Sequence, residues 1–201
     1  MSEVIKISTD GYNGTTIQPD IEVLSLVDEN DPILKSKTPD FNFENPDVDP
    51  VKFASELVET CKLHNGFGLA APQVGMSVRA FVMGGGDEYV AMFNPSILEQ
   101  SQEQSLIAEG CLSFPMLALK ISRPKKIKIQ YFDFNGDKHE ADFEGLTAHV
   151  FQHELDHLDG ICYTERAKPM SLKMGLKKKD KFNKLVTRYE AAQKRLSDLS
   201  K

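Results

Sequence analysis

Five consecutive residues, His153-Glu154-Leu155-Asp156-His157, have the types and spacing of a metal site with a general base beside it. Residues four apart lie on the same face of an α-helix, so the two imidazoles could bind one metal ion. The glutamate that follows the first histidine would then point towards the open coordination position of that ion. A chance occurrence would leave two inward-facing histidines without partners, so the pattern predicts a metal-dependent hydrolase.

A catalytic ion of this kind takes three protein ligands and keeps one position for water. Downstream of His157 the chain offers Cys162 and Glu165, but not the third histidine of the metzincin proteases. The better candidate is upstream, in Glu109-Gly110-Cys111-Leu112-Ser113. A thiolate in this tight, glycine-containing segment would bind a divalent ion strongly, and the ion would keep it deprotonated.

The elements that must position these side chains can be predicted from hydrophobic periodicity. Helices are expected over the apolar stripe at residues 54–61 and at residues 146–158 and 171–199. Short strands are expected at residues 78–83, 89–93, 117–121, 127–134 and 139–143. This order predicts an α+β fold, with antiparallel sheets packed around a central helix that carries HExxH, plus a C-terminal helix.

Composition limits the class of protein. The chain has 201 residues, of which 40% are hydrophobic and 27% charged, an ordinary balance for a globular protein with one compact core. No apolar run approaches the ~20 residues that span a bilayer. Residues 1–16 lack the basic start and apolar run of a signal peptide, and the three cysteines form no disulfide pattern. We therefore expect a cytoplasmic protein without a membrane partner.

Charge is distributed unevenly along the chain. Residues 166–201 contain 12 basic and 3 acidic side chains, whereas residues 1–165 contain 12 basic and 27 acidic ones. A basic tail can contact an anionic partner, but a solvated helix face that balances an acidic body would give the same pattern. We expect residues 1–165 to form the catalytic domain, with 166–201 as a basic amphipathic helix packed on it or extending from it.

Three segments together resemble the signature motifs of the peptide deformylase family. Gly66-Phe67-Gly68-Leu69-Ala70-Ala71-Pro72-Gln73 is similar to GxGLAAPQ, Glu109-Gly110-Cys111-Leu112-Ser113 to EGCLS, and residues 152–160 to QHExDHLxG. The resemblance covers about residues 22–165. It implies a hydrolase that removes the N-formyl group from the N-terminal formylmethionine of newly made polypeptides.

The resemblance also implies the metal site. Cys111, His153 and His157 would be the ligands of one divalent ion, with Fe(II) as the family's usual metal and Zn(II) as a common substitute. Glu154 would take a proton from the attacking water and later deliver it to the leaving amine.

Further roles follow for residues around that ion. The side-chain amide of Gln73 and the backbone N–H of Leu112 would donate to the oxyanion. Gly68, which has no Cβ, would let backbone and substrate approach closely. The pocket for the methionine side chain is expected one to two turns before His153, and its candidate wall residues are Leu146, His149 and Val150.

The partners implied are a nascent N-formylmethionyl polypeptide and the ribosome. Some bacterial deformylases dock on the ribosome through a basic C-terminal helix, so Lys177-Lys178-Lys179 and Lys181 are expected to contact rRNA phosphates. The protein is expected to be a monomer.

Two other functions compete with this interpretation. A zinc endopeptidase would share the HExxH chemistry but would not need the motifs at residues 66–73 and 109–113. A non-catalytic, metal-stabilised binding module would keep the ligands but would have no need for Glu154 or Gln73.

Overall fold

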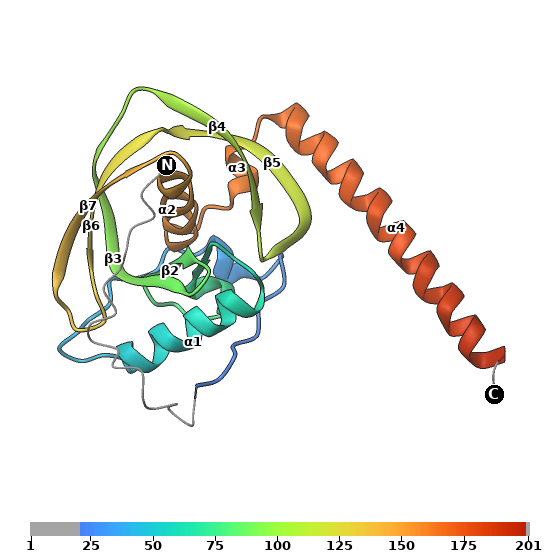
Figure 1. Cartoon of the computed structure of the whole chain (residues 1–201), viewed down its shortest axis with the longest axis horizontal. Helices are drawn as coiled ribbons and strands as arrows, with labels where there is room; N and C mark the ends of the chain where they lie inside the picture. The colour runs from blue at the N-terminus through green and yellow to red at the C-terminus, as the bar shows by residue number, and fades with distance from the viewer. Residues whose placement is uncertain (1–20, 200–201) are drawn as a thin grey trace.

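A computed structural model describes residues 21–199 of the chain, and Figure 1 shows its ribbon. The helices are α1 (Pro50–Leu63), α2 (Leu146–Leu158), α3 (Tyr163–Arg166) and α4 (Pro169–Leu199), with two short 3-10 helices, η1 (Pro32–Lys35) and η2 (Ala71–Val74). The strands are β1 (Gly68–Ala70), β2 (Ala80–Gly85), β3 (Glu88–Gln100), β4 (Gln104–Cys111), β5 (Phe114–Pro124), β6 (Lys126–Phe132) and β7 (Lys138–Glu144). Residues 1–16, for which no signal peptide is predicted, lie outside the described residues.

The strands form two antiparallel sheets. The larger sheet has the order β1-β2-β3-β6-β7, and β4 pairs with β5 in a second sheet. In Figure 1 the strands surround α2, while α1 lies below it on the other side of β2. The predicted α+β fold, with antiparallel sheets around the HExxH helix and a C-terminal helix, is therefore confirmed.

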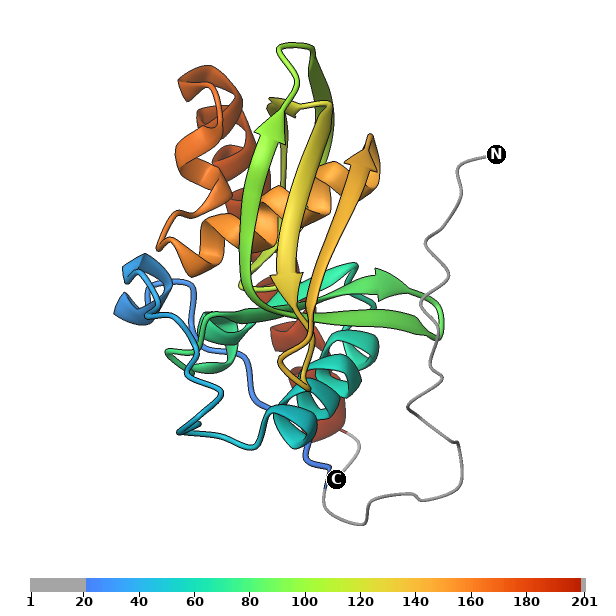
Figure 2. The ribbon, with the colours of Figure 1, turned by 90° about the vertical axis from the view of Figure 1, so that its left-hand side faces the viewer.

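The larger sheet carries apolar side chains on both of its faces. Phe81 on β2 belongs to the cluster that packs against Phe151 of α2, whereas its neighbour Val82 belongs to the cluster that contains Leu57 of α1. Successive residues of a strand point to opposite faces, so one strand serves both clusters. Figure 2 shows the result, with α2 and α1 on opposite sides of the β2–β3 hairpin.

The central helix α2 buries polar side chains as well as apolar ones. It begins after Gly145, which has a φ of 63°, and Gly160 with a φ of 72° follows its end. Its buried residues include Gln152, His153, Glu154 and Asp156. Burying such groups costs free energy unless they find partners, so the surroundings of α2 must supply hydrogen bonds or a ligand.

Periodicity alone did not predict β1, β4 or α3. The inward-facing positions of β4 include the polar residues Ser105 and Glu109, which hides the apolar alternation that marks a half-buried strand. The glycine-containing segment around Cys111 is the end of this strand, where Cys111 pairs with Phe114 of β5 after an irregularity in the register.

Helix α4 packs on β5 and then runs past the body of the protein. At Gly175 a Cβ would lie 2.7 Å from Leu119 Cδ2 and 2.9 Å from Leu117 Cδ1, so glycine permits close packing. Lys179 forms an ion pair with Glu29.

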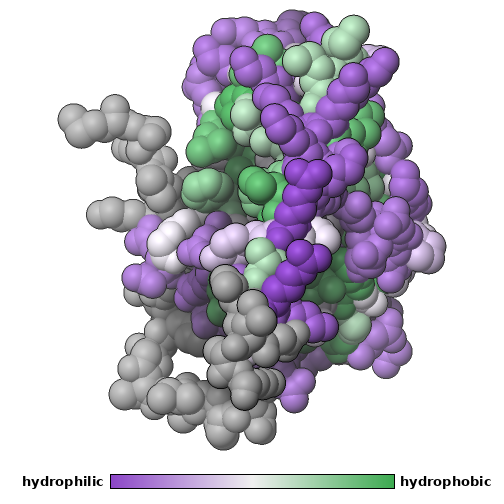
Figure 3. Space-filling model, turned by 90° about the vertical axis from the view of Figure 1, so that its right-hand side faces the viewer, coloured by the Kyte–Doolittle hydropathy of each residue, from purple (hydrophilic) through white to green (hydrophobic). Residues whose placement is uncertain are grey.

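Farther along, the exposed apolar side chains of α4 are Phe182, Leu185 and Tyr189. Figure 1 shows α4 projecting from the body, and Figure 3 shows that this face carries hydrophilic side chains with hydrophobic patches between them. Within the described residues, no helix combines the length and the hydropathy needed to cross a membrane.

Candidate active site

Three side chains that could hold a metal ion meet where the end of β4 faces α2. The ligand atoms of Cys111, His153 and His157 lie within 4.8 Å of one another, and Cys111 Sγ is 3.2 Å from His157 Nε2. The two histidines share one face of α2 because they are four residues apart. One thiolate and two imidazoles are a suitable donor set for zinc or iron. The structure thus brings together the three residues selected for metal binding.

The charges around these donors fit a bound cation. Burial lowers the pKa of His157 well below its ordinary value, and the positive charges of His153 and Arg123 lower it further. Its ring is therefore neutral, the form that binds a metal. Burial also opposes protonation of His153, but hydrogen bonds with Cys111 and Glu109 outweigh this effect and raise the pKa of His153 to about 10. The negative groups around His153, which include Glu109 and Glu154, therefore favour a positive charge at that ring.

Glu109 on β4 accepts hydrogen bonds from three surrounding side chains. Arg123 donates twice, with Nε 2.6 Å from Oε1 and Nη2 2.9 Å from Oε2. His153 Nδ1 lies 2.9 Å from Oε2, and His149 Nδ1 lies 3.0 Å from Oε1. Burial raises the pKa of Glu109, but hydrogen bonds from His153 and Arg123 outweigh it and lower the pKa to about 2. Because Nδ1 of His153 faces this carboxylate, its Nε2 is left for a metal.

The ion pair continues from Arg123 to Asp156 on the metal-binding helix. Arg123 Nη1 lies 2.7 Å from Asp156 Oδ2, and Arg166 Nη2 lies 2.7 Å from Asp156 Oδ1. Arg123 is 4% exposed, so this network ties β5, α2 and α3 together inside the protein. Sequence reasoning gave Arg123 and Asp156 no role, although both lie in quoted or conspicuous segments. For Asp156 the available signal was its place between the two histidines of the HExxH segment.

Glu154 lies against the backbone of Gly68 at the same site. A Cβ on Gly68 would be 2.4 Å from Glu154 Oε1, so only glycine leaves room for the carboxylate. Glu154 is 4% exposed, and its Oε2 has no hydrogen-bond partner among residues 21–199. Burial raises the pKa of Glu154 to about 7, because the lowering effect of the His153 charge is smaller. A carboxyl group with such a pKa can both take and release a proton near neutral pH.

Gln73 of η2 directs its amide nitrogen towards Cys111 and Ser113. Its Oε1 accepts from the Ala70 backbone N–H at 2.8 Å, which fixes the orientation of the amide. Its Nε2 lies 3.4 Å from Cys111 Sγ and 3.1 Å from Ser113 Oγ. Leu112, next to the metal ligand, lines the same pocket.

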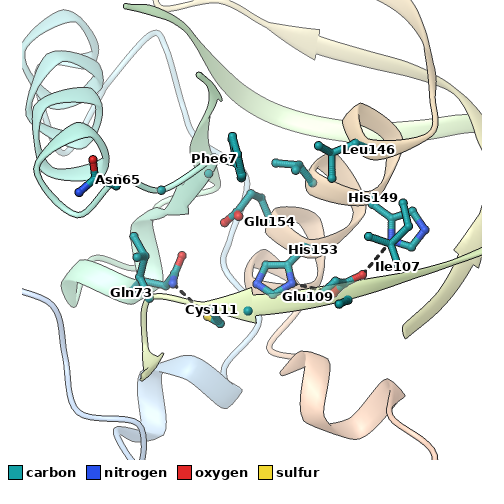
Figure 4. A pocket seen from close by; sticks show the side chains of 16 residues that line it. Asn65, Phe67, Gln73, Ile107, Glu109, Cys111, Leu146, His149, His153 and Glu154 are labelled. Atoms are coloured by element: carbon teal, nitrogen blue, oxygen red, sulfur yellow. Dashed lines mark hydrogen bonds and ion pairs between the residues drawn. The ribbon is translucent and has the colours of Figure 1, made fainter. Parts of the chain in front are cut away.

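These side chains surround one pocket of about 360 Å³, shown in Figure 4. Its lining includes the four residues predicted for substrate binding, which are Gly68, Leu146, His149 and Val150. Leu146 is 53% exposed, whereas His149 is 1% exposed and lies deep in the wall. His157 is 1% exposed and is not among the lining residues, whereas Cys111 and His153 are.

The side chains that the sequence offered as alternative metal ligands make other contacts. The Cys162 thiol faces the backbone carbonyl of Leu34 at 3.8 Å, and Glu165 accepts from the Cys162 backbone N–H at the start of α3. His149 approaches the centre only through Glu109. None of these three side chains joins the cluster of metal-binding residues.

Comparison with known proteins identifies the family. Residues 23–173 match the model of the family described as polypeptide deformylase. The chain belongs to the polypeptide deformylase family. A curated peptide deformylase of Thermotoga maritima is 44% identical over 140 residues, which are 69% of this chain and 84% of the relative. A crystal structure of peptide deformylase from the same organism has a TM-score of 0.70 at 39% identity, with 74% of this chain and 99% of that chain covered.

Structures of family members with bound ligands are also similar. A peptide deformylase from Synechococcus elongatus in complex with actinonin has a TM-score of 0.73 at 29% identity, covering 78% of this chain and 86% of that chain. A Met-Ala-Ser-bound enzyme from Acinetobacter baumannii has a TM-score of 0.68 at 32% identity, covering 73% and 99% of the two chains.

Family membership settles the class of reaction. Polypeptide deformylases are metal-dependent hydrolases that remove the N-formyl group from new polypeptides, and this chain is an enzyme of that family. The predicted family and activity are therefore confirmed. The two competing interpretations, a zinc endopeptidase and a non-catalytic binding module, are not supported.

Proposed function

We propose that Cys111, His153 and His157 hold one divalent ion in this deformylase and that Glu154 is its general acid and base. The observation that carries the proposal is the convergence of three donors beside a buried carboxylate that has no hydrogen-bond partner within residues 21–199. When bound, the ion would supply Lewis-acid chemistry, making the attacking water more acidic and polarising the formyl oxygen. We propose Fe(II) as the ion and Zn(II) as a substitute, because thiolate and imidazole donors accept both.

Glu154 would move one proton from water to the leaving group. Its carboxylate takes the proton as water attacks the formyl carbon, and it delivers the proton to the peptide nitrogen as the C–N bond breaks. Formate and a free α-amino group leave, and Glu154 is ionised again. The pKa of about 7 supports this role, because neither protonation state is strongly disfavoured at neutral pH.

Two donors would stabilise the oxyanion that forms during attack. The Gln73 amide is held with its nitrogen towards Cys111, and the Leu112 backbone N–H follows the same ligand. Fixed donors of this kind lower the barrier because they need no reorganisation during the reaction. On this proposal, two adjacent residues have different roles: Cys111 holds the metal, and the backbone N–H of Leu112 donates to the oxyanion.

The substrate would be a nascent chain that begins with formylmethionine. Its methionine side chain would lie between Leu146, His149 and Val150, and Gly68 would leave space for the substrate backbone beside Glu154. The Met-Ala-Ser peptide bound by the Acinetobacter baumannii relative supports an unblocked methionyl product.

The protein would act in the cytoplasm as a monomer that reaches its substrate at the ribosome. Helix α4 would dock on rRNA phosphates, and the division into a catalytic domain (1–165) and a basic helix (166–201) would separate chemistry from docking. Four basic side chains of α4 surround exposed Phe182 and Leu185, and they are Lys178, Lys181, Lys184 and Arg188. Such a surface would bind phosphates in a salt-dependent way.

A pair of matched cysteine variants tests the metal assignment. The protein is purified without oxygen in the presence of Fe(II), and its metal content and its hydrolysis of a formyl-Met peptide are measured. Cys111→Ser should lose bound metal and activity together, whereas Cys162→Ser should keep both, since Cys162 contacts Leu34 instead. Stoichiometric metal and full turnover in Cys111→Ser would refute the proposed ligand set. Purification in air should lower the activity of the iron form, and equal activity with iron retained would argue against Fe(II).

A further inference from the structure

One residue in the wall of the pocket, His149, has both ring nitrogens hydrogen-bonded to other side chains of the protein. Its Nδ1 lies 3.0 Å from Glu109 Oε1, and its Nε2 lies 2.7 Å from Ser105 Oγ. The ring is 1% exposed, and it lines the pocket beside the apolar residues Ile107 and Val150. Both polar atoms of the ring are therefore satisfied by the protein itself.

Both partners of His149 come from one face of β4. Ser105, Ile107 and Glu109 alternate with the exposed residues Leu106 and Ala108, so the three side chains point towards α2. The ring of His149 bridges from the serine to the glutamate on that face. Figure 4 shows the contact with Glu109, which also joins His153 on its other oxygen.

The hydrogen bonds place a proton on Nδ1 of His149. Glu109 is paired through both oxygens with the Arg123 guanidinium, so this carboxylate can only accept. The proton of His149 must therefore lie on Nδ1. A neutral ring then has a lone pair on Nε2, which the Ser105 hydroxyl can satisfy by donating its proton. Without Ser105 a buried acceptor would be left in the pocket wall, and such groups readily take another donor.

We propose that Ser105 is a specificity-determining residue, which acts through His149. Its hydroxyl occupies Nε2 of the imidazole, and the pocket consequently selects an apolar side chain such as methionine although a histidine lines it. This inference rests on the proposed function and extends it, because it explains how a polar residue in the wall is compatible with a methionine substrate. Ser105 is a positioning residue and takes no part in the bond-breaking steps.

Substrate selectivity tests the inference. Formyl-Met and formyl-Gln peptides have first side chains of similar length, but only the glutamine amide can donate to a free Nε2. In Ser105→Ala the ratio of kcat/KM for formyl-Met over formyl-Gln should fall about tenfold, mainly through KM. Ser105→Thr keeps a hydroxyl on a strand position and should restore the ratio. Ser122→Ala is the matched control, since Ser122 is an exposed serine on the neighbouring strand β5.

The outcomes separate the inference from the function on which it rests. An unchanged ratio in Ser105→Ala, or an equal loss of kcat for both peptides, would overturn the role of Ser105 while leaving the deformylase assignment intact. A wild-type protein that hydrolyses neither peptide would overturn the proposed function and this inference with it.

A spectroscopic measurement covers the case in which Ser105→Ala folds poorly. Nitrogen NMR of histidine-labelled, zinc-loaded wild type distinguishes the two neutral tautomers from the imidazolium, and loss of one signal set in His149→Leu identifies the ring. We expect His149 to be protonated on Nδ1 alone. A charged ring, or one protonated on Nε2, would contradict the inference.

Discussion

Gly68 and Glu154 fit together so closely that a single added carbon would separate them. A Cβ on Gly68 would lie 2.4 Å from Oε1 of Glu154 and 2.7 Å from its Cδ and Cγ. Gly68 starts β1, and Glu154 lies on α2, so this contact sets the position of the carboxylate relative to the larger sheet. The glycine in the first motif is therefore explained by the Glu154 carboxylate that it accommodates.

Gly68→Ala should displace Glu154 and reduce kcat by about a hundredfold, because small displacements of a catalytic group are costly. Metal content should stay equal to that of the wild type, since Cys111, His153 and His157 are untouched. Gly85→Ala serves as the control, because a Cβ there meets only the Phe67 ring at 3.8 Å. Turnover in Gly68→Ala equal to that of the control would show that Glu154 tolerates the shift.

Arg123→Ala should destabilise the protein by about 3–5 kcal/mol, because it leaves the buried carboxylates of Glu109 and Asp156 without their shared cation. Lys125→Ala, just after the end of β5, removes a solvent-exposed ion pair with Glu103. It should lower the free energy of unfolding by less than about 1 kcal/mol. Urea unfolding followed by circular dichroism measures both free energies of unfolding. Similar losses in the two variants would mean that the buried network contributes little.

Stability should fall in acid because of Glu109. Its folded-state pKa of about 2 is below the ordinary value of 4.5, so its contribution is complete above pH 4.5 and is lost as the pH falls towards 2. The free energy of unfolding should fall by about 3 kcal/mol over this range. In Glu109→Gln the free energy of unfolding should change less with pH over this range. The free energy of unfolding of the metal-free protein is the suitable measure, since acid also releases a bound ion. Parallel curves for the two proteins would contradict the low pKa.

Reversing charge on α4 should weaken binding to ribosomes. The triple variant Lys178→Glu, Lys181→Glu and Lys184→Glu should bind about tenfold more weakly at low salt, with a smaller salt dependence than the wild type. The control is a triple variant with the same change in net charge on β5, β6 and β7, at Lys120, Lys126 and Lys138. Co-sedimentation provides the affinities, and equal binding of the two variants would rule out docking through α4.

The sequence predicts some parts of this protein well because the physical signal is local. The bounds of α2 at Leu146 and Leu158 match the expectation, since apolar spacing and a following glycine both mark that helix. The HExxH spacing places His153 and His157 on one helical face without any knowledge of the sheet. The position of Cys111 beside them depends on β4, so helix periodicity could not predict it; its glycine-containing segment and the family motif indicated it.

Other parts depend on contacts between residues far apart in the chain. Glu109 and Arg123 are 14 residues apart, and Arg123 and Asp156 are 33 apart, so their ion pairs cannot be read from periodicity. The same polar residues disguise β4, because its inward side binds α2 through hydrogen bonds where an ordinary strand would present apolar groups. Ser105 has no local signal at all, and its relation to His149 appears only when β4 and α2 are in place.

The central claim is that Glu154 transfers the proton at a metal site held by other residues. Its most direct test is hydrolysis of a formyl-Met peptide by anaerobic, Fe(II)-loaded wild type and Glu154→Ala, with metal content measured in both. We predict fast turnover by the wild type and a loss of at least about a hundredfold in the variant, at equal metal content. Comparable turnover by Glu154→Ala with its metal bound would contradict the account.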